Sequence, residues 1–334
     1  MINLGVIGYG YWGPNVSRNF NSCQGTKLVT ICDLNETRLK LAKSTFPFIK
    51  VSSNPEDLFN SDDIQAVAIV TPVFTHYELA KAALESGKHI FVEKPFTLNA
   101  GQAEELINLA LQKNLKIMVD HTFLFTGAVR KIREIIDSGE LGSLFFYDST
   151  RINLGLFQHD INVVWDLAPH DFSIMNYLLE KCPVAISAQG TDHFGTGIED
   201  MAYIAAHFDN GFIGHFHCNW LSPVKIRTTL ISGDKKMLVW DDLESDEKIK
   251  IYDRGVEFRN GDGIDKLLVS YRSGDMHSPK ISNTEALQLE AQYFLDCIEK
   301  NIEPFNNGEA GLRVVRMLEA TDKSLKKGGE KIKI

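Results

Sequence analysis

The segment from Gly8 to Gly13 has the sequence Gly-Tyr-Gly-Tyr-Trp-Gly, in which the glycines follow the spacing G-x-G-x-x-G. It comes directly after a short apolar run and opens a helical pattern, the context in which this spacing binds a dinucleotide. Gly8 would allow the tight turn, Gly10 the close approach of a pyrophosphate, and Gly13 close packing of helix on sheet. Free N–H groups at the helix start would bind the phosphates, with Tyr11 and Trp12 beside them. The alternative is a glycine turn with a purely structural role.

Asp33 bears on which dinucleotide binds. It ends the second predicted strand, where a carboxylate accepts hydrogen bonds from the adenosine ribose hydroxyls. The same charge repels a 2′-phosphate, so we expect NAD, with NADP less favoured. Arg38 has two interpretations that stay open: contact with the adenine or a phosphate, or a solvated helix face.

Two more segments end predicted strands at the same edge of the sheet, where open α/β folds bind ligands. One is Thr71-Pro72, with His76 shortly after it, and the other is Glu93-Lys94-Pro95. Lys94 would stabilise the negative charge that develops on an alkoxide during alcohol oxidation. Most lysines are surface charges, but this position favours a functional role.

Asp166 and His170 are spaced i, i+4, which puts both on one face if the segment is helical. His170, with an ordinary pKa of about 6.5, suits a general base. Asp166 would orient the imidazole or hold a substrate hydroxyl. Pro169 fits a first helical turn better than a helix interior, so we predict a helix near 169–179, which leaves open that Asp166 precedes it. Whether Lys94 or His170 takes the proton also stays open.

Several side chains near these segments are further candidates. Trp165 would stack on the nicotinamide or on a sugar face, with core packing as an equal alternative. His121, after the last strand of the first region, is expected to line the cofactor cleft. A polar stretch before Asp166 offers candidate contacts to substrate hydroxyls or phosphates, unless it is a surface loop. These candidates are Arg151, Asn153, His159 and Asn162.

The elements that must position these residues change character near His121. Before it, brief apolar runs alternate with helical patterns, which predicts a doubly wound parallel sheet of the Rossmann type. The predicted strands are Ile2–Ile7, Lys27–Cys32, Gln65–Val70, His89–Val92 and Lys116–Val119, and the helices are Trp12–Ser22, Asn35–Ser44, Thr75–Glu85 and Ala100–Lys113. We therefore expect a dinucleotide-binding domain over residues 1–121.

Residues 122–334 are predicted to form a substrate-binding α+β domain. Strands separated by turn signals indicate a large, mainly antiparallel sheet with helices on one side. The predicted strands are Leu144–Asn153, Ala185–Gly190, Met201–Phe208, Phe212–Trp220, Ile226–Ser232, Lys236–Trp240 and Ile249–Tyr252, after a helix over Ala128–Ile136. Gly255–Ser282 has little periodicity and predicts a long loop. Two closing helices are expected over about 284–327.

The combined motifs resemble the glucose-fructose oxidoreductase / inositol dehydrogenase (Gfo/Idh/MocA) family. The resemblance rests on the glycine motif, on Thr-Pro-x-x-x-His from Thr71, on Glu93-Lys94-Pro95 and on Asp166-x-x-x-His170, and extends to the last helix with Glu-Ala-Gly-Leu-Arg from Glu309. It implies an NAD-dependent oxidoreductase acting on CH–OH groups, with Lys94, Asp166 and His170 as the catalytic constellation. It also implies that the Lys94-Pro95 bond is cis.

The Trp-Asp-Leu-Ala-Pro-His-Asp segment from Trp165 is similar to the branch of that family acting at C3 of UDP-N-acetylhexosamines. This implies a 3-keto product for amino sugars of surface polysaccharide or lipid A. The alternatives are a cyclitol or simple-sugar dehydrogenase, a deoxysugar ketoreductase, or a protein of another class that binds NAD and a sugar without turnover. The family's use of the second-domain sheet to pair subunits leads us to expect a homodimer or homotetramer.

The sequence also carries signals that we set aside. His215-x-His217 places two imidazoles on one strand face, but no third ligand is spaced nearby, so we expect no metal site. Tyr177-x-x-x-Lys181 has the letters of the short-chain dehydrogenase pair, yet Tyr177 lies in an apolar helix, where packing explains it. The charge run over 241–250 is expected to be a solvated hairpin.

Composition excludes other classes of protein. The 334 residues suggest two domains, and the 44 acidic against 35 basic residues give a net charge of −9, which disfavours docking on nucleic acid or an anionic membrane. Five scattered cysteines without C-x-x-C spacing suggest free thiols in a reducing compartment. The sequence shows neither a signal h-region nor an apolar stretch of about 18 residues, so we expect a cytoplasmic protein.

Overall fold

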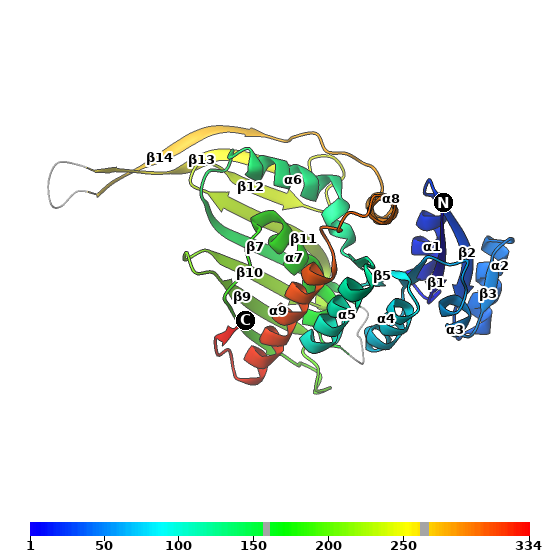
Figure 1. Cartoon of the computed structure of the whole chain (residues 1–334). Helices are drawn as coiled ribbons and strands as arrows, with labels where there is room; N and C mark the ends of the chain where they lie inside the picture. Colours follow the sequence, from blue (N-terminus) through cyan, green and yellow to red (C-terminus); the bar gives the residue numbers. More distant parts are fainter. Residues whose placement is uncertain (156–160, 261–266) are drawn as a thin grey trace. The chain divides into compact units, whose positions relative to one another are not determined.

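The computed structural model describes residues 1–155, 161–260 and 267–334 and divides into two compact units (Figure 1). The first unit comprises residues 1–125 and 284–316, and the second comprises 126–283 and 317–334. His159, one of the predicted substrate contacts, lies outside the described residues.

The first unit contains a six-stranded sheet in the order β3-β2-β1-β4-β5-β6, with every neighbouring pair parallel. This is the strand order of the doubly wound fold that binds dinucleotides, so the predicted fold class is confirmed. The strands are β1 (Ile2–Ile7), β2 (Thr26–Cys32), β3 (Lys50–Ser52), β4 (Ala66–Ile69), β5 (His89–Glu93) and β6 (Ile117–Asp120). Only β3 was not predicted, because its three residues are largely exposed and form no apolar run.

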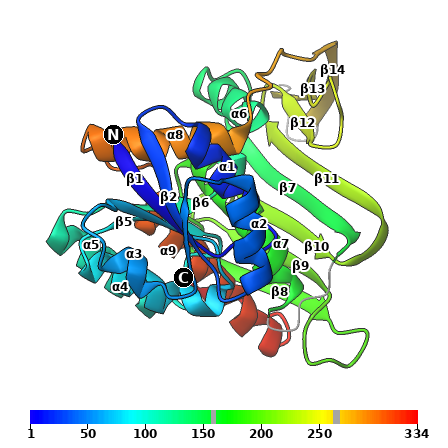
Figure 2. The ribbon, with the colours of Figure 1, turned by 90° about the vertical axis from the view of Figure 1, so that its right-hand side faces the viewer.

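Helices cover both faces of this sheet (Figure 2). They are α1 (Gly13–Ser22), α2 (Glu36–Thr45), α3 (Glu56–Phe59), α4 (His76–Glu85), α5 (Ala100–Lys113) and α8 (Ala286–Glu299), with 3-10 turns at Val73–Thr75 and Thr122–Phe125. Helix α8 joins this unit through Phe294, whose ring lies 6.1 Å from that of Phe20 and 5.9 Å from that of Phe91. This aromatic core explains why residues 284–316 pack with the first unit, although the boundary near His121 places them with the second.

The second unit contains a nine-stranded sheet in the order β14-β13-β12-β11-β7-β10-β9-β8-β15, antiparallel except for the β10–β7 pair. Helices α6 (Gly127–Asp137) and α7 (Val163–Leu179) lie over one face of it (Figures 1 and 2). Phe172 of α7 packs edge-on against Phe216, with ring centroids 4.9 Å apart. The strands are β7 (Leu144–Leu154), β8 (Ala185–Thr191), β9 (Met201–His207), β10 (Ile213–Asn219), β11 (Leu221–Gly233), β12 (Met237–Asp241), β13 (Ile249–Asn260), β14 (Leu267–His277) and β15 (Ile332–Lys333).

The prediction of a long loop over Gly255–Ser282 is wrong. β13 and β14 pair antiparallel through most of that stretch, with Val256 opposite Tyr271. Val256 is 48% and Tyr271 83% exposed, so at this pair no buried side chain reveals the strands in the sequence.

Helix α7 begins earlier than the 169–179 prediction. The side chain of Asn162 accepts hydrogen bonds from the N–H groups of Val164 and Trp165, both at 3.1 Å, and so caps the helix before Val163. Pro169 therefore lies inside the helix, and Asp166 is in its first turn. The cap, rather than the proline, decides where the helix starts.

The last helix, α9 (Gly308–Lys326), begins in the first unit and ends in the second. All five cysteines are free thiols. Among the helices of the described ranges, none has the length and apolar character needed to cross a membrane.

Candidate functional site

Two glycines of the Gly8–Gly13 turn lie where no side chain fits. Gly8 has φ of 98°, and a Cβ there would come within 2.4 Å of the Val70 carbonyl oxygen. A Cβ on Gly13 would lie 2.3 Å from the Gly8 carbonyl oxygen. A Cβ on Gly10, in contrast, would meet only the Arg38 guanidinium, at 3.1 Å, so no backbone closes that side. The turn therefore has the tight, open backbone that a pyrophosphate needs.

Asp33 is fixed beside this turn at the end of β2. Its Oδ2 accepts a 2.6 Å hydrogen bond from the Tyr9 N–H, and its Oδ1 accepts one of 2.8 Å from the Asn35 N–H. The Arg38 guanidinium lies 3.9 Å from the carboxylate and is half-exposed. The structure thus adds an ion pair with Asp33 to the two interpretations of Arg38.

The aromatic residues of the turn point to different surroundings. Tyr11 is 90% exposed, which leaves its ring available to a ligand. The Trp12 indole instead donates a 3.3 Å hydrogen bond to Asp120 at the end of β6.

The His76 ring connects the segments that follow β4 and β5. One ring nitrogen lies 2.9 Å from the Pro95 carbonyl oxygen and the other 2.8 Å from that of Thr71. The Thr71 hydroxyl accepts a hydrogen bond from Thr75, and the Lys94-Pro95 peptide bond is cis, as the resemblance implies. With both nitrogens occupied by backbone and the ring fully buried, His76 is a support for the Thr71 and Lys94 segments, not a group facing a ligand.

His121 differs from His76 in that its ring nitrogens are not occupied by backbone groups of the part of the chain that the structure describes. Its side chain is buried, and within the described residues neither ring nitrogen has a hydrogen-bond partner. Burial lowers its pKa to about 4, with a smaller contribution from Lys94, so the imidazole is neutral at pH 7. A buried polar ring without a protein partner is what a bound ligand would complete.

In the second unit, α7 carries Asp166 and His170 one turn apart on the same face. Asp166 Oδ2 accepts a 2.9 Å hydrogen bond from the indole nitrogen of Trp220, which is itself buried. Both Asp166 and His170 remain partly exposed. The structure therefore brings this predicted pair together and adds Trp220, which the sequence analysis missed.

Asn162 and Trp165 are engaged in holding α7 in place. The Asn162 amide nitrogen donates to Glu199 at 3.0 Å and to Asp322 at 3.2 Å, in addition to its capping role. The Trp165 indole donates to Asp322 at 2.8 Å, and the side chain is buried. These contacts favour the packing interpretation of Trp165, and they give Asn162 a positioning role that the sequence analysis did not consider.

Arg151 is buried and bound to Asp171. Its Nε and one terminal nitrogen donate to the two carboxylate oxygens at 2.8 and 2.9 Å, a bidentate pair in which both side chains are at most 4% exposed. A substrate contact would require this pair to open, so we assign Arg151 a structural role. Asn153, two residues further on β7, is half-buried.

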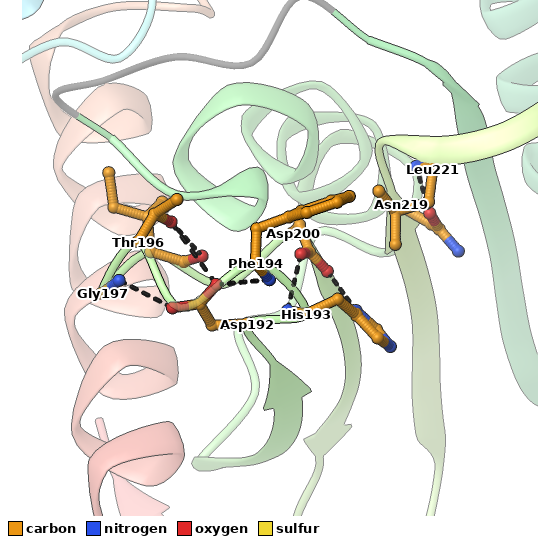
Figure 3. Close-up of polar contacts among 9 residues, drawn as sticks. Asp192, His193, Phe194, Thr196, Gly197, Asp200, Asn219 and Leu221 are labelled. Atoms are coloured by element: carbon orange, nitrogen blue, oxygen red, sulfur yellow. Dashed lines mark hydrogen bonds and ion pairs between the residues drawn. The ribbon is translucent and has the colours of Figure 1, made fainter.

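The loop between β8 and β9 is held by polar contacts among its own residues, including those of His193 with Asp200 (Figure 3), and its backbone binds Trp220 and the start of α7. Buried Asp200 accepts hydrogen bonds from the His193 ring at 2.6 Å and from the His193 N–H at 2.8 Å. The Asp200 carbonyl accepts from the Trp220 N–H, and the Glu199 carbonyl accepts from the Val163 N–H, each at 3.0 Å. The signal that could have revealed Trp220 is its position as the last residue of a predicted strand.

Comparison with known proteins agrees with these features. Residues 2–121 match the family model described as "Oxidoreductase family, NAD-binding Rossmann fold", and residues 129–239 match the "GFO/IDH/MocA C-terminal domain". The chain belongs to the Gfo/Idh/MocA family of oxidoreductases. Its cofactor is accordingly NAD, and the residues present fit that group: the glycine turn, Asp33 beside it and the unpartnered imidazole of His121.

Curated relatives of this Gfo/Idh/MocA protein are distant. The chain is 32% identical to the uncharacterized oxidoreductase YdgJ of Escherichia coli over 58% of this chain and 60% of that protein, less than two thirds of its length. It is 26% identical to scyllo-inositol 2-dehydrogenase (NAD(+)) of Bacillus subtilis, over 91% and 88% of the two chains. It is also 26% identical to UDP-N-acetylglucosamine 3-dehydrogenase of Acidithiobacillus ferrooxidans, over 94% of each.

A solved structure of the last enzyme, GnnA, superposes with a TM-score of 0.83 at 24% identity and covers 98% of each chain. At this identity the likeness shows the fold of the Gfo/Idh/MocA protein and not its substrate. Among the described residues no cluster of His, Cys, Asp and Glu could hold a metal ion.

Proposed function

We propose that this protein is an NAD-dependent dehydrogenase that oxidises a ring secondary hydroxyl of a sugar nucleotide. The proposed position is C3 of a UDP-N-acetylhexosamine or its uronic acid, and the product is a 3-keto sugar for amino-sugar synthesis. The observation that carries the dehydrogenase proposal is that Asp166 and His170 lie on one face of α7, in a chain whose NAD-binding unit presents Lys94 at the end of β5. The full-length relative acting on UDP-N-acetylglucosamine supports the substrate class.

The residues divide the chemistry of alcohol oxidation between them. Bound NAD supplies the acceptor for the hydride that leaves the substrate carbon. The hydroxyl proton goes to a base, for which the half-buried imidazole of His170 is suited, while the ammonium of Lys94 stabilises the developing alkoxide. Lys94 is the alternative proton acceptor. Asp166 orients His170 or a substrate hydroxyl and is itself held by Trp220.

The turn, Asp33 and His121 form the proposed cofactor contacts. Backbone N–H groups at the start of α1 would receive the phosphates, and Asp33 the ribose hydroxyls. Tyr11, Thr71, Pro72 and Arg38 stay proposed neighbours of the cofactor, and Asn153 a proposed contact of the substrate.

A second candidate function is a cyclitol or simple-sugar dehydrogenase, favoured by the equal identity to scyllo-inositol 2-dehydrogenase. A protein that binds NAD and a sugar without turnover is disfavoured, because such a protein needs neither Lys94 nor His170. NADH formation measured at 340 nm with UDP-sugars, free sugars and inositols distinguishes the three. Binding of NAD without turnover of any substrate in either direction would eliminate the enzyme proposal.

We also propose that the protein forms a homodimer or homotetramer through the sheet face that α7 does not cover. His215 and His217 alternate along β10 with buried Phe216, so they lie on that opposite face. Tyr203 stacks on His217 with ring centroids 4.2 Å apart and is 43% exposed. A half-exposed aromatic row on a broad sheet is typical of a surface that another subunit covers. Sedimentation analysis tests this directly, and a monomer would disprove it.

A further inference from the structure

Three carboxyl groups meet inside the first unit, close to the Gly8–Gly13 turn. Glu93 and Asp120 stand opposite each other in the register of β5 and β6. Glu290 of α8 reaches the same place: Asn306 donates both to Glu290 and to the carbonyl of Val119, the residue before Asp120, and the Glu290 carboxyl lies within hydrogen-bonding reach of Asp120. Asp120 and Glu290 are at most 2% exposed. Three adjacent carboxyl groups with little contact with water cannot all be charged without a large electrostatic penalty.

The hydrogen bonds of Asp120 and Glu290 indicate which of these two carboxyl groups carries a proton. Asp120 accepts at both oxygens, Oδ2 from the Trp12 indole and Oδ1 from the Thr122 hydroxyl. Glu290 Oε1 accepts a 2.9 Å hydrogen bond from the Asn306 amide, while its Oε2 is buried and receives none from any donor in the described part of the chain. Because carboxylate oxygens only accept, a hydrogen bond between Glu290 and Asp120 requires a proton on one of the two. Both Asp120 oxygens already accept from other donors, whereas Glu290 Oε2 accepts from none among the described residues, which favours Glu290 as the protonated partner.

The surrounding charges do not remove this requirement. Burial raises the pKa of Glu290 well above its ordinary value, Asp120 and Glu93 raise it further, and the Thr122 hydroxyl lowers it only in part. Glu93 has the same raised pKa, for which burial and then Asp120 are responsible, with Lys94 opposing. The other titratable groups nearby are His121, which is neutral, and Arg313, whose influence reaches His121.

We propose that Glu290 is a protonated positioning residue, which donates its proton to Asp120 and so fixes the Trp12 indole and the glycine turn in the form that binds NAD. The proposal rests on the NAD-binding role of the first unit. Glu290 lies on a helix far from the turn in sequence, and the hydrogen bonds of Asp120 connect it to the Trp12 indole. Its effect is therefore on cofactor affinity and not on the chemical step.

The first test measures the proton without any cofactor. An unfolded glutamate loses its proton near pH 4.3, whereas the pKa of Glu290 is raised in the folded protein, so above about pH 5.5 the folded state binds more protons at this position than the unfolded chain does. In wild type the free energy of unfolding therefore declines with rising pH, with a slope that corresponds to one proton. E290Q, a neutral side chain of the same shape that can donate to Asp120, lacks that contribution. Urea unfolding at several pH values should give slopes that differ by about one proton, and equal slopes would overturn the proposal.

E285Q is the matched control, because Glu285 directly precedes the same helix, α8. Glu285 is bound by Arg18 at 2.6 Å, which lowers its pKa, so its charge stabilises the folded state at neutral pH. E285Q should lose that stabilisation, which is present above the unfolded pKa and lost as the pH falls. Above about pH 5.5 Glu285 is ionised in both states, so E285Q should keep the wild-type slope there while E290Q does not, and an equal change of slope in both variants would contradict the assignment.

The second test asks whether the proton acts through Trp12. NADH affinity, followed by fluorescence titration, should stay within about threefold of wild type in E290Q and weaken by about tenfold or more in E290L and in W12F. Circular dichroism and thermal unfolding identify variants that are folded at the titration temperature. If Glu290 acts through Trp12, the double variant W12F/E290L should weaken NADH binding no more than either single one, a non-additivity of about tenfold. The positioning role would be overturned if the losses of NADH affinity were additive, or if E290Q bound NADH as weakly as E290L.

The outcomes separate this inference from the proposed function. Loss of NADH binding in every protein, wild type included, would contradict the NAD assignment, and the pH slopes of E290Q would still report the proton. Normal NADH binding with no turnover of any sugar would leave the positioning role supported and the dehydrogenase proposal disproved.

Discussion

The indole of Trp220 donates a 2.9 Å hydrogen bond to the carboxylate of Asp166, one turn before His170 on α7. The donor is buried and anchored in turn, since its backbone N–H is bound to the Asp200 carbonyl. One oxygen of Asp166 is thereby fixed, and the carboxylate has a set orientation toward its neighbours on the helix face. Trp220 is therefore a positioning residue: it orients Asp166 and takes no part in the proton transfer itself.

W220F should lower kcat by about tenfold while leaving NADH affinity unchanged, because it removes the hydrogen bond to Asp166 and keeps the aromatic packing. The pH dependence of kcat/KM should shift as well, since the carboxylate that accompanies His170 loses a donor. W240F is a control, as Trp240 is a buried indole in β12 of the second unit. A W220F enzyme with unchanged pH profile and kcat would show that Trp220 only fills space.

K94A should lower kcat by about 100-fold or more with little change in NADH affinity, because the ammonium is assigned to the alkoxide and not to cofactor binding. K81A removes a cation of the same unit that is paired with Glu105 at 2.7 Å on the surface, and it should leave turnover unchanged. Steady-state kinetics with the best sugar substrate checks both. Unchanged turnover in K94A would refute its role.

NADH should bind at least about tenfold more tightly than NADPH, because Asp33 repels a 2′-phosphate. D33S should narrow that difference by weakening NADH and relieving the repulsion of NADPH. The Asp33 carboxylate also accepts two backbone N–H groups, so part of the NADH loss reflects a looser turn. Fluorescence titration with the two cofactors gives the ratio, and a preference for NADPH in the wild-type protein would refute the argument.

These residues differ in how far the sequence reveals them. The glycine turn, the parallel strands and the strand-end residues Asp33 and Lys94 are local patterns, so their placement could be predicted. Trp220 and Glu290 could not be predicted, because each acts on a residue far away in the chain through contacts that only the fold creates. The pairing of β13 with β14 was missed because exposed positions such as Val256 and Tyr271 give no alternation of polar and apolar residues.

Acid should destabilise the protein partly through His121. The pKa of His121 is about 4 in the folded state, against about 6.5 in the unfolded chain. Below pH 6.5 the unfolded chain therefore binds a proton at this imidazole that the folded protein does not bind. Stability is therefore lost as the pH falls from about 6.5 to about 4, by roughly 3 kcal/mol in total. H121N does not titrate and should lack this decline in urea unfolding between pH 4.5 and 7.

His215 provides a control of opposite sign. Its pKa is raised by the hydrogen bond to Asp148, so its stabilising contribution is present below the unfolded pKa and is lost as the pH rises. H215N should therefore lose stability in acid, where H121N gains relative to wild type. Parallel pH curves for H121N and wild type would show that burial does not lower the pKa of His121 below its value in the unfolded chain.

The last prediction separates a structural from a substrate-binding role for Arg151. Its bidentate pair with Asp171 is buried, so R151M leaves an uncompensated carboxylate and should lower the free energy of unfolding by about 3 to 5 kcal/mol. The double variant R151M/D171L removes both charges and should recover most of that loss, because an apolar pair can replace a buried ion pair. Urea unfolding gives the stabilities, and KM for the sugar substrate in the double variant should stay within about threefold of wild type. A stable double variant with a KM raised tenfold or more would instead place Arg151 at the substrate.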